Sequence, residues 1–193
     1  MSARPGLLVR EARPSELRHL AAIEDSGAPL FREWCAGDLP PALVAPAPTG
    51  HQRDAQPGRL LVALDPAYDG GPVGFAHVLW LHDDAGLPAA HLEQLSVLLP
   101  EHGRRGVGSA LVRAACEEAR WEGHRAISLC TYRDALWNGP FYRRLGFREE
   151  PRPAAYLRRL REHEQALGLD ACGVREVLVR DLDRSDRDQV TDQ

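Results

Sequence analysis

A short run rich in glycine and arginine is the stretch of this sequence best suited to bind a ligand. The run is Gly103-Arg104-Arg105-Gly106-Val107-Gly108-Ser109, and it follows an apolar segment that Pro100 ends. Glycine lets a backbone approach a ligand closely, and the free N–H groups at the start of a helix attract an anion. Arginine side chains add charge-assisted hydrogen bonds to phosphate. We therefore interpret the run as a pyrophosphate cradle at a strand-to-helix turn.

Two other phosphate-binding turns fit these residues poorly. A dinucleotide-binding turn has the order Gly-x-Gly-x-x-Gly, with an acidic residue about 20 positions further on. Here the order is Gly-x-x-Gly-x-Gly, and the residue at the later position is Ser128. A Walker loop requires Gly-Lys-Ser/Thr, whereas this chain contains no lysine. The glycine order therefore argues against a dinucleotide-dependent oxidoreductase, and the missing lysine argues against a Walker-type site.

Two motifs together resemble those of the GNAT superfamily of acetyl-CoA-dependent N-acetyltransferases. The first joins Leu95-Ser96-Val97 to Arg105-Gly106-Val107-Gly108-Ser109, as in the superfamily's strand end and its Gln/Arg-x-x-Gly-x-Gly/Ala turn. Gly103 departs from that pattern because Gln or Arg is usual there, which removes a side-chain contact and leaves the backbone cradle. The second segment, Asn138 to Phe147, is similar to the superfamily's Asn … Tyr-x-x-Leu-Gly-Phe segment. The resemblance covers roughly residues 7–180.

The resemblance implies an α/β fold with a mixed, mostly antiparallel sheet that is splayed at its centre and flanked by helices. Hydrophobic periodicity adds the element boundaries. Strands 91–99 and 126–132 should be parallel neighbours, because a helix crosses over between them. Asp134 is expected to cap a helix over 135–145. The other expected strands are 7–12, 59–64, 73–80 and 174–179, and the other expected helices begin at Pro14, Pro29, Ser109 and Tyr156.

Length and composition indicate one domain with a surface loop and a tail. A chain of 193 residues fits a single domain, which we place at residues 1–182. Residues 39–58 are rich in Pro, Ala and Gly and show no period, so we expect a surface loop, either a lid or a passive insertion. Residues 183–193 are charged and lack apolar anchors, which predicts a disordered tail.

Charge and cysteine usage exclude several classes of partner. A formal net charge of −4 argues against nucleic-acid binding, which needs a basic face. No apolar run approaches the ~18 residues of a membrane span, so we expect no membrane partner and a cytoplasmic location. The four cysteines are scattered, which predicts neither a metal site nor a disulfide framework; they are Cys35, Cys116, Cys130 and Cys172. A homodimer is compatible with the sequence.

The resemblance implies acetyl-CoA as co-substrate, bound largely by main-chain atoms. The diphosphate would meet the glycine-rich turn, and the peptide-like pantetheine arm would pair with the end of strand 91–99. The N–H of Val97 would then face the thioester oxygen, and Asn138 would contact the cofactor through its amide. The cofactor-binding residues implied in this way are Leu95, Ser96, Val97, Arg104, Arg105, Gly106, Val107, Gly108, Ser109 and Asn138.

Acyl transfer to an amine also needs a base for the amine and an acid for the departing thiolate. By resemblance, Tyr142 is the general acid, since a phenol holds its proton at neutral pH. His91 and Glu93 lie two residues apart on one expected strand and so point to one face. The superfamily often has its base at one of these two positions, although some members use a chain of waters. His91, Glu93 and water therefore all remain candidates.

The acceptor site is less defined by the sequence. The resemblance places it beside the first two helices, where Phe31 and Trp34 could wall a pocket for an apolar or aromatic amine. The leading hypothesis is an enzyme that moves an acetyl group from acetyl-CoA to a primary amine of a small molecule or peptide, by direct attack in a ternary complex. The alternatives are a non-catalytic CoA-binding or regulatory module and a transferase of a longer acyl group.

Overall fold

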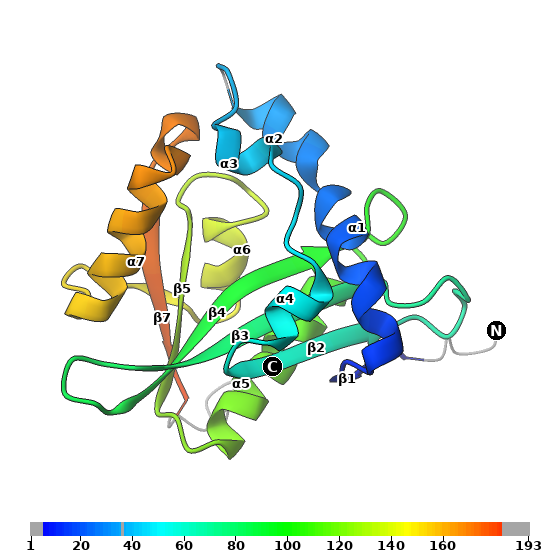
Figure 1. The fold of residues 1–193 in the computed structure, drawn as a ribbon, viewed down its shortest axis with the longest axis horizontal. Helices are drawn as coiled ribbons and strands as arrows, with labels where there is room; N and C mark the ends of the chain where they lie inside the picture. Colours follow the sequence, from blue (N-terminus) through cyan, green and yellow to red (C-terminus); the bar gives the residue numbers. More distant parts are fainter. Residues whose placement is uncertain (1–5, 36, 183–193) are drawn as a thin grey trace, which may run out of the picture.

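A seven-stranded sheet carries helices on both faces (Figure 1). The computed structural model describes residues 6–35 and 37–182. The strand order is β1-β2-β3-β4-β5-β7-β6, and in the described chain every neighbouring pair is antiparallel except β4–β5. The strands are β1 Leu8–Glu11, β2 Gly58–Leu64, β3 Gly74–His82, β4 Pro88–Val97, β5 Ala126–Tyr132, β6 Arg148–Glu149 and β7 Arg175–Asp181. The expectation of a mixed, mostly antiparallel sheet is confirmed.

The sheet opens between its two parallel strands. Pairing of β4 with β5 is limited to Ala90 with Ile127 and His91 with Ser128. Beyond these pairs, β4 runs on to Val97 and β5 to Tyr132 as they diverge, and helix α6 (Gly139–Arg144) lies in the opening (Figure 1). The backbone groups that face this opening therefore lack strand partners across it.

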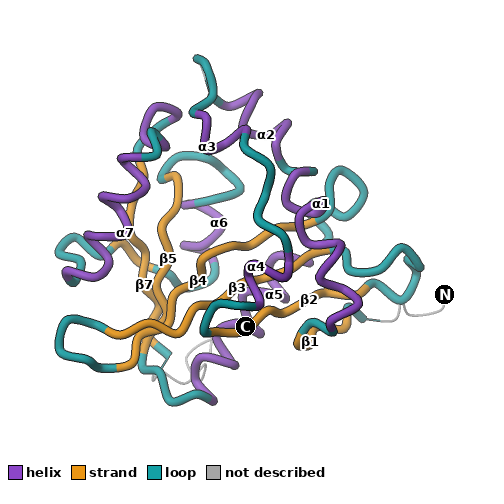
Figure 2. The backbone as a smooth tube through the Cα atoms, viewed as in Figure 1, coloured by secondary structure: helices purple, strands orange, loops and turns teal. Residues whose placement is uncertain are grey.

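Helices cover the two faces differently (Figure 2). The long helix α5 (Val107–Trp121) packs the apolar stripe Leu111, Ala115 and Ala119 against one face. The opposite face is covered by Leu17, Leu20 and Ile23 in a cluster with Phe75 of β3. The remaining helices are η1 Pro14–His19, α1 Leu20–Asp25, α2 Ala28–Trp34, α3 Pro41–Val44, α4 Gly50–Asp54, α7 Ala155–Ala166 and η2 Leu169–Cys172. None of the helices described combines the length and apolar character needed to cross a bilayer.

A glycine sets how closely the start of α5 approaches the sheet. A Cβ added to Gly74 of β3 would lie 2.9 Å from Val107 Cγ1 and 2.9 Å from the Ser96 carbonyl oxygen. Only glycine leaves enough room there for α5 to reach β3 and β4 together. The turn before α5 is thereby held beside the end of β4.

A β-bulge interrupts β4 at Glu93. The partner of His77 is Gln94, whereas the partner of the next residue, Val78, is Leu92, so Glu93 has no counterpart on β3. Such an extra residue bends a strand and re-aims its side chains. Both Leu92 and Leu95 consequently pack on the α5 face, although they lie an odd number of positions apart.

Three sequence-based expectations need correction. The 39–58 segment is not without regular structure, because it contains α3 and α4, and α4 begins at a capping box made by Thr49 and Gln52. Asp134 does not cap a helix; it pairs with Arg133, and α6 begins later, at Gly139, with Asn138 as its N-cap residue. The predicted tail, 183–193, lies outside the described residues.

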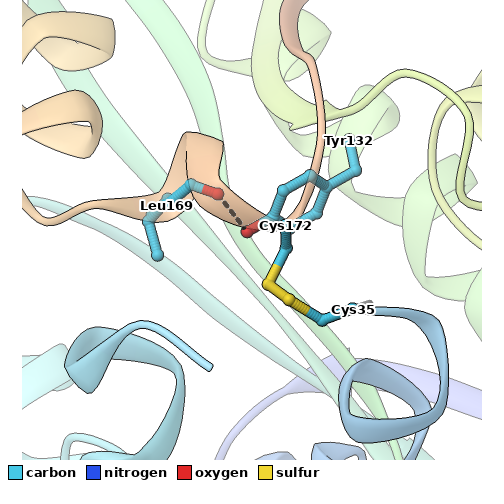
Figure 3. The surroundings of a disulfide bond; sticks show 4 residues. All are labelled: Cys35, Tyr132, Leu169 and Cys172. Carbon is cyan, nitrogen blue, oxygen red and sulfur yellow. Dashed lines mark hydrogen bonds between the residues drawn. A yellow bond between two sulfur atoms is a disulfide. The ribbon is translucent and has the colours of Figure 1, made fainter. Parts of the chain in front are cut away.

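The third correction concerns the cysteines. Cys35, just after α2, forms a disulfide with Cys172 at the end of η2 (Figure 3). The two residues are 137 positions apart and belong to no short cysteine motif, so spacing gave no sign of the bond. Cys116 and Cys130 are free thiols. The cross-link joins the helices that precede β2 to the segment that leads into β7.

Candidate active site

The turn before α5 presents a run of free backbone amides. Gly106 is the N-cap residue, in the left-handed conformation at φ 85°, and Arg104 also has a positive φ of 57°. The N–H of Ala110 donates to the Gly106 carbonyl at 3.0 Å, but no amide from Arg104 to Ser109 donates to another described residue. Amides of a first helical turn and of a left-handed turn together form a concave anion site. The free amides are of the kind that bind a diphosphate, and the diphosphate contact predicted for them stays a prediction.

The end of β4 offers backbone groups beside this turn. The N–H of Leu98 donates to the Val73 carbonyl of β3 at 2.9 Å. Because pairing groups alternate along an antiparallel strand, the backbone of Val97 faces the other way, toward the opening between β4 and β5. The Ser26 hydroxyl lies 3.5 Å from the Val97 carbonyl oxygen, and the Val97 N–H faces the opening. Gly108 adjoins the same place, since a Cβ there would lie 3.7 Å from Val97 Cγ2.

Tyr142 lies on α6, and Asn138 is the N-cap residue of that helix. Tyr142 is 8% exposed and packs edge-on against Phe141 and Phe147, with ring centroids 5.0 and 5.7 Å away. Burial raises the pKa of its hydroxyl above the ordinary value, so the phenol is protonated at neutral pH. Asn138 makes no cap hydrogen bond with its side chain, which leaves its amide available to a ligand. The roles predicted for both residues at the cofactor stay predictions.

His91 and Glu93 lie together on the other face of β4, and their environments differ. Nε2 of His91 is 3.7 Å from Glu93 Oε2. His91 is 3% exposed, and burial lowers its pKa to about 4, so its imidazole is neutral at pH 7. The Glu93 side chain is 44% exposed, and burial of its carboxylate, together with the nearby Glu164 carboxylate, raises its pKa. A carboxylate with a raised pKa that remains in contact with solvent is suited to accept a proton from an amine.

Two arginine–carboxylate pairs flank Glu93. Arg53 of α4 is bonded to Glu24 of α1, and its guanidinium lies 5.4 Å over the Phe75 ring. On the other side, Arg175 of β7 bonds Glu164 of α7 at 2.5 Å. Among the described residues, Glu93 has no arginine partner of its own. Sequence reasoning missed Arg53, Glu164 and Arg175, because ionic residues scattered over distant elements carry no local pattern.

The predicted acceptor aromatics belong to a cluster of four rings. Trp34 and Phe31 of α2 contact Tyr132 at the end of β5, with centroids 4.9 and 6.0 Å away, and both contact Trp137. The Tyr132 hydroxyl donates to the Leu169 carbonyl at 2.8 Å, beside the disulfide (Figure 3). The rings thus tie α2 to the end of β5.

A shallow cavity of about 360 Å³ lies at α1, α2 and α3. Ser26, one of its lining residues, accepts a hydrogen bond from the Leu99 N–H at 3.0 Å, so the cavity meets the end of β4. Asp25 and Arg32 supply charges of both signs to its lining. The segment predicted as a surface loop contributes the apolar wall, through Leu43, Val44, Ala45 and Pro46.

Residues 56–149 match a family model described as "Acetyltransferase (GNAT) domain". This match identifies the segment from β2 to β6 as GNAT acetyltransferase sequence. Transfer of an acyl group from coenzyme A is the reaction class that this family supports. The matched residues include the amide run, β4 and Tyr142, whereas Phe31, Trp34 and Glu164 lie outside them.

Solved structures confirm the fold of the GNAT domain. N-acetylglutamate synthase from Neisseria gonorrhoeae, complexed with coenzyme A and N-acetyl-glutamate, is 17% identical with a TM-score of 0.62; the alignment covers 95% of this chain and 37% of that one. A GNAT family acetyltransferase from Brucella melitensis in complex with acetyl-CoA is 23% identical over 74% of this chain and 83% of that one, with a TM-score of 0.52. PaiA N-acetyltransferase from Thermoplasma acidophilum, in complex with coenzyme A, is 13% identical with a TM-score of 0.62. The alignment covers 92% of this chain and 99% of that one.

Proposed function

We propose that this protein transfers an acetyl group from acetyl-CoA to a primary amine of a small molecule or peptide, by direct attack in a ternary complex. The single observation that carries the proposal is the run of unpaired amides from Arg104 to Ser109, beside the open backbone edge of Val97. A diphosphate on those amides directs the pantetheine arm along β4. The thioester carbon then lies in the opening between β4 and β5, within reach of side chains on both faces of β4.

The amine enters from the face that carries Glu93 and is deprotonated there. Its nitrogen attacks the thioester carbonyl, whose oxygen accepts a hydrogen bond from the Val97 N–H as negative charge develops. Holding both substrates in one opening supplies most of the rate enhancement that positioning can give. Collapse of the intermediate breaks the carbon–sulfur bond and releases a thiolate toward Tyr142.

Tyr142 supports the departing thiolate with its hydroxyl proton. An ordinary thiol has a pKa of ~8.5 and a phenol ~10, and burial raises that of Tyr142 further. Its proton is therefore shared with the sulfur in a hydrogen bond as the thiolate leaves, and the proton that the thiol finally carries comes from the attacking nitrogen. Removal of this hydroxyl should slow turnover more than it weakens cofactor binding, which depends on the backbone.

The test is thiol release from acetyl-CoA over a panel of primary amines, run with wild-type protein and Tyr142→Phe. We expect amine-dependent release by the wild type, a fall in kcat of about 10- to 100-fold in the variant, and little change in CoA affinity. Tyr68→Phe, a change in an exposed turn, is the matched control. Release no faster than hydrolysis for every amine would favour a non-catalytic CoA-binding module, and faster reaction with longer thioesters would favour a different acyl group.

A further inference from the structure

A hydroxyl contacts an imidazole at the last point where β4 and β5 are paired. The Ser128 Oγ lies 2.9 Å from Nδ1 of His91 and donates to the Ala90 carbonyl at 3.1 Å. Ser128 and His91 are each 3% exposed and face one another across the parallel pair. The contact is therefore shielded from water, and its proton positions follow from the few partners available.

The network assigns one tautomer to His91. A serine hydroxyl has one proton and two acceptor lone pairs. The Ala90 carbonyl can only accept a hydrogen bond, and the Tyr156 hydroxyl is a further partner of Ser128. With the Ser128 proton given to Ala90 and its lone pairs turned to Tyr156 and Nδ1, Nδ1 carries the imidazole proton. The imidazole is neutral at pH 7, so Nε2 is left with a free lone pair.

Two acceptors then face each other at the floor of the opening. Nε2 of His91 lies 3.7 Å from Glu93 Oε2, and neither atom has a hydrogen-bond donor among the described residues. His77 is a useful contrast, since both of its ring nitrogens are enclosed without partners. Nε2 of His91 is not enclosed in that way, and the Glu93 beside it is 44% exposed. A donor that arrives from the cleft can reach both acceptors.

We propose that Ser128 is a positioning residue that fixes the Nδ1–H tautomer of His91, so that His91 Nε2 and Glu93 form a two-acceptor site for the ammonium group of the acceptor. The proposal rests on the transferase function proposed above and names the chemistry that its acceptor must have. The ligand needs at least two N–H groups on one cationic nitrogen, which a primary ammonium provides and a quaternary ammonium does not.

Glu93 is the carboxylate available to that cation, because the arginines near it are paired with other carboxylates. The guanidinium groups of Arg53 and Arg175 are engaged by Glu24 and Glu164. The polar groups that influence the pair or its tautomer from neighbouring elements are Glu24 of α1, Arg53 of α4, Tyr156, His163 and Glu164 of α7, and Arg175 of β7. Glu24 and Glu164 are thus each paired with an arginine, whereas Glu93 is not and can pair with the ammonium group of the acceptor.

The proton then moves in a balanced step. The bound ammonium transfers one proton to the Glu93 carboxylate, which becomes a carboxylic acid, and the neutral amine stays hydrogen-bonded to His91 Nε2. The lone pair released on nitrogen attacks the thioester carbon. As the carbon–sulfur bond breaks, the nitrogen loses a second proton, which ends on the departing sulfur, so the products are an amide and a thiol. Because the Glu93 side chain is partly exposed, it returns its proton to water and is ready for another ammonium.

The first experiment is nitrogen-15 NMR of the histidine rings in wild-type protein, with His91→Gln used to assign the His91 signals. We expect His91 to show a protonated Nδ1 and an unprotonated Nε2 near neutral pH. This measurement needs no substrate, so its outcome is independent of whether the protein is a transferase. A protonated Nε2 in the wild type would overturn the proposal, even if Ser128 variants fail to fold.

The second experiment adds a probe and a variant. Propylammonium should shift the His91 Nε2 signal, whereas tetramethylammonium, which has charge but no N–H, should not. Ser128→Ala should raise the amine KM about tenfold, the effect of one lost hydrogen bond to a charged group, with CoA affinity unchanged and the Nδ1–H tautomer reduced. Ser128→Thr should restore the tautomer and the KM, and Thr131→Val, on the opposite face of β5, should alter neither.

Two results would contradict this assignment. A tautomer that is unchanged in Ser128→Ala would show that Ser128 does not position His91. Equal shifts with both probe cations would show that charge alone is recognised. Loss of amine-dependent thiol release throughout the panel, with the tautomer as expected, would instead remove the proposed transferase function.

Discussion

The two sides of β4 recognise their ligands by different means. On the cofactor side, most candidate groups are main-chain amides and carbonyls from one contiguous stretch, Leu95–Ser109, joined by the side chains of Asn138 and Tyr142. On the acceptor side, they are side chains contributed by α1, α4, β4, α7 and β7, held by ion pairs. Recognition by the main chain requires only that glycines occupy certain positions in the sequence. Recognition by side chains depends on how elements that are distant in the sequence pack together. The first kind of site is therefore visible in the sequence, and the second emerges only in the fold.

The largest expected effect comes from a substitution that impairs the acceptor side alone. Glu93→Gln keeps the shape of the side chain but cannot accept the proton of the ammonium group, so kcat/KM should fall by about 10²- to 10⁴-fold. CoA affinity, measured by calorimetry, should stay within the experimental error of the wild type. Glu117→Gln, on the exposed face of α5, is the matched control. A comparable loss of CoA binding in Glu93→Gln would mean that the two sides are not separable.

The pH dependence of kcat/KM tests the same difference between the two sides of β4. Because burial raises the pKa of Glu93, its deprotonated form is reached only at a pH above the ordinary glutamate value of ~4.3. The acid limb of the kcat/KM profile should therefore lie above that value in the wild type and vanish in Glu93→Gln. The folded state holds this proton more tightly than the unfolded state, so ionisation of Glu93 destabilises the fold as pH rises through that window. Glu93→Gln should accordingly unfold at a slightly higher temperature at pH 7.

The next largest expected effect is a loss of CoA affinity caused by a substitution on the cofactor side. A Cβ at Gly108 would lie 3.4 Å from Phe141 Cζ, so Gly108→Val places methyl groups into the space beside the free amides. We expect CoA affinity to fall about 100-fold, or ~2.7 kcal/mol. Arg105→Ala removes an exposed charge and leaves the amides in place, so its loss should be only about threefold and should shrink with added salt. Equal losses in the two variants would show that side-chain charge, and not the backbone, holds the diphosphate.

The smallest expected effect on the kinetics comes from removing the disulfide. Cys35→Ser should lower the free energy of unfolding by about 2 kcal/mol, since the cross-link restricts the unfolded chain. The amine KM should rise modestly because α2 and its rings are less firmly held, and CoA affinity should not change. Thermal unfolding with and without reductant measures the first effect. Cys130→Ser, at a free thiol, is the control, and an unaltered melting temperature in Cys35→Ser would contradict the structural role of the bond.

The predictable part of the fold follows from local patterns. The apolar runs of β2 and β3, the glycine-rich turn and the apolar stripe of α5 each depend on neighbours in the sequence, and each lies where it was expected. The stretch 91–99 showed only a partial alternation because the bulge at Glu93 shifts the pattern by one residue. Together with the spacing of His91 and Glu93, that irregularity was a local sign of the acceptor side, and its cause is seen only in the pairing with β3.

The rest could not be obtained from local patterns. Cys35 and Cys172 meet only because α2 and η2 lie at the same end of the sheet, which no spacing rule encodes. Arg53 is 5% exposed within a segment whose composition indicated a loop, because its ion pair with Glu24 and the Phe75 ring hold it in place. Asp134 had the residue type of a helix cap, yet the chain continues to Asn138 before it turns helical. The roles of Tyr142, His91 and Glu93 stay predictions for the experiments above.

The bond between Cys35 and Cys172 also closes a covalent loop in the chain. The exposed stretch around Val44–Pro48 and every strand from β2 to β6 lie within that loop. A protease that cuts a single peptide bond there would leave both fragments fastened to each other. The nicked protein would migrate as one species on a gel without reductant and as two fragments once the bond is reduced.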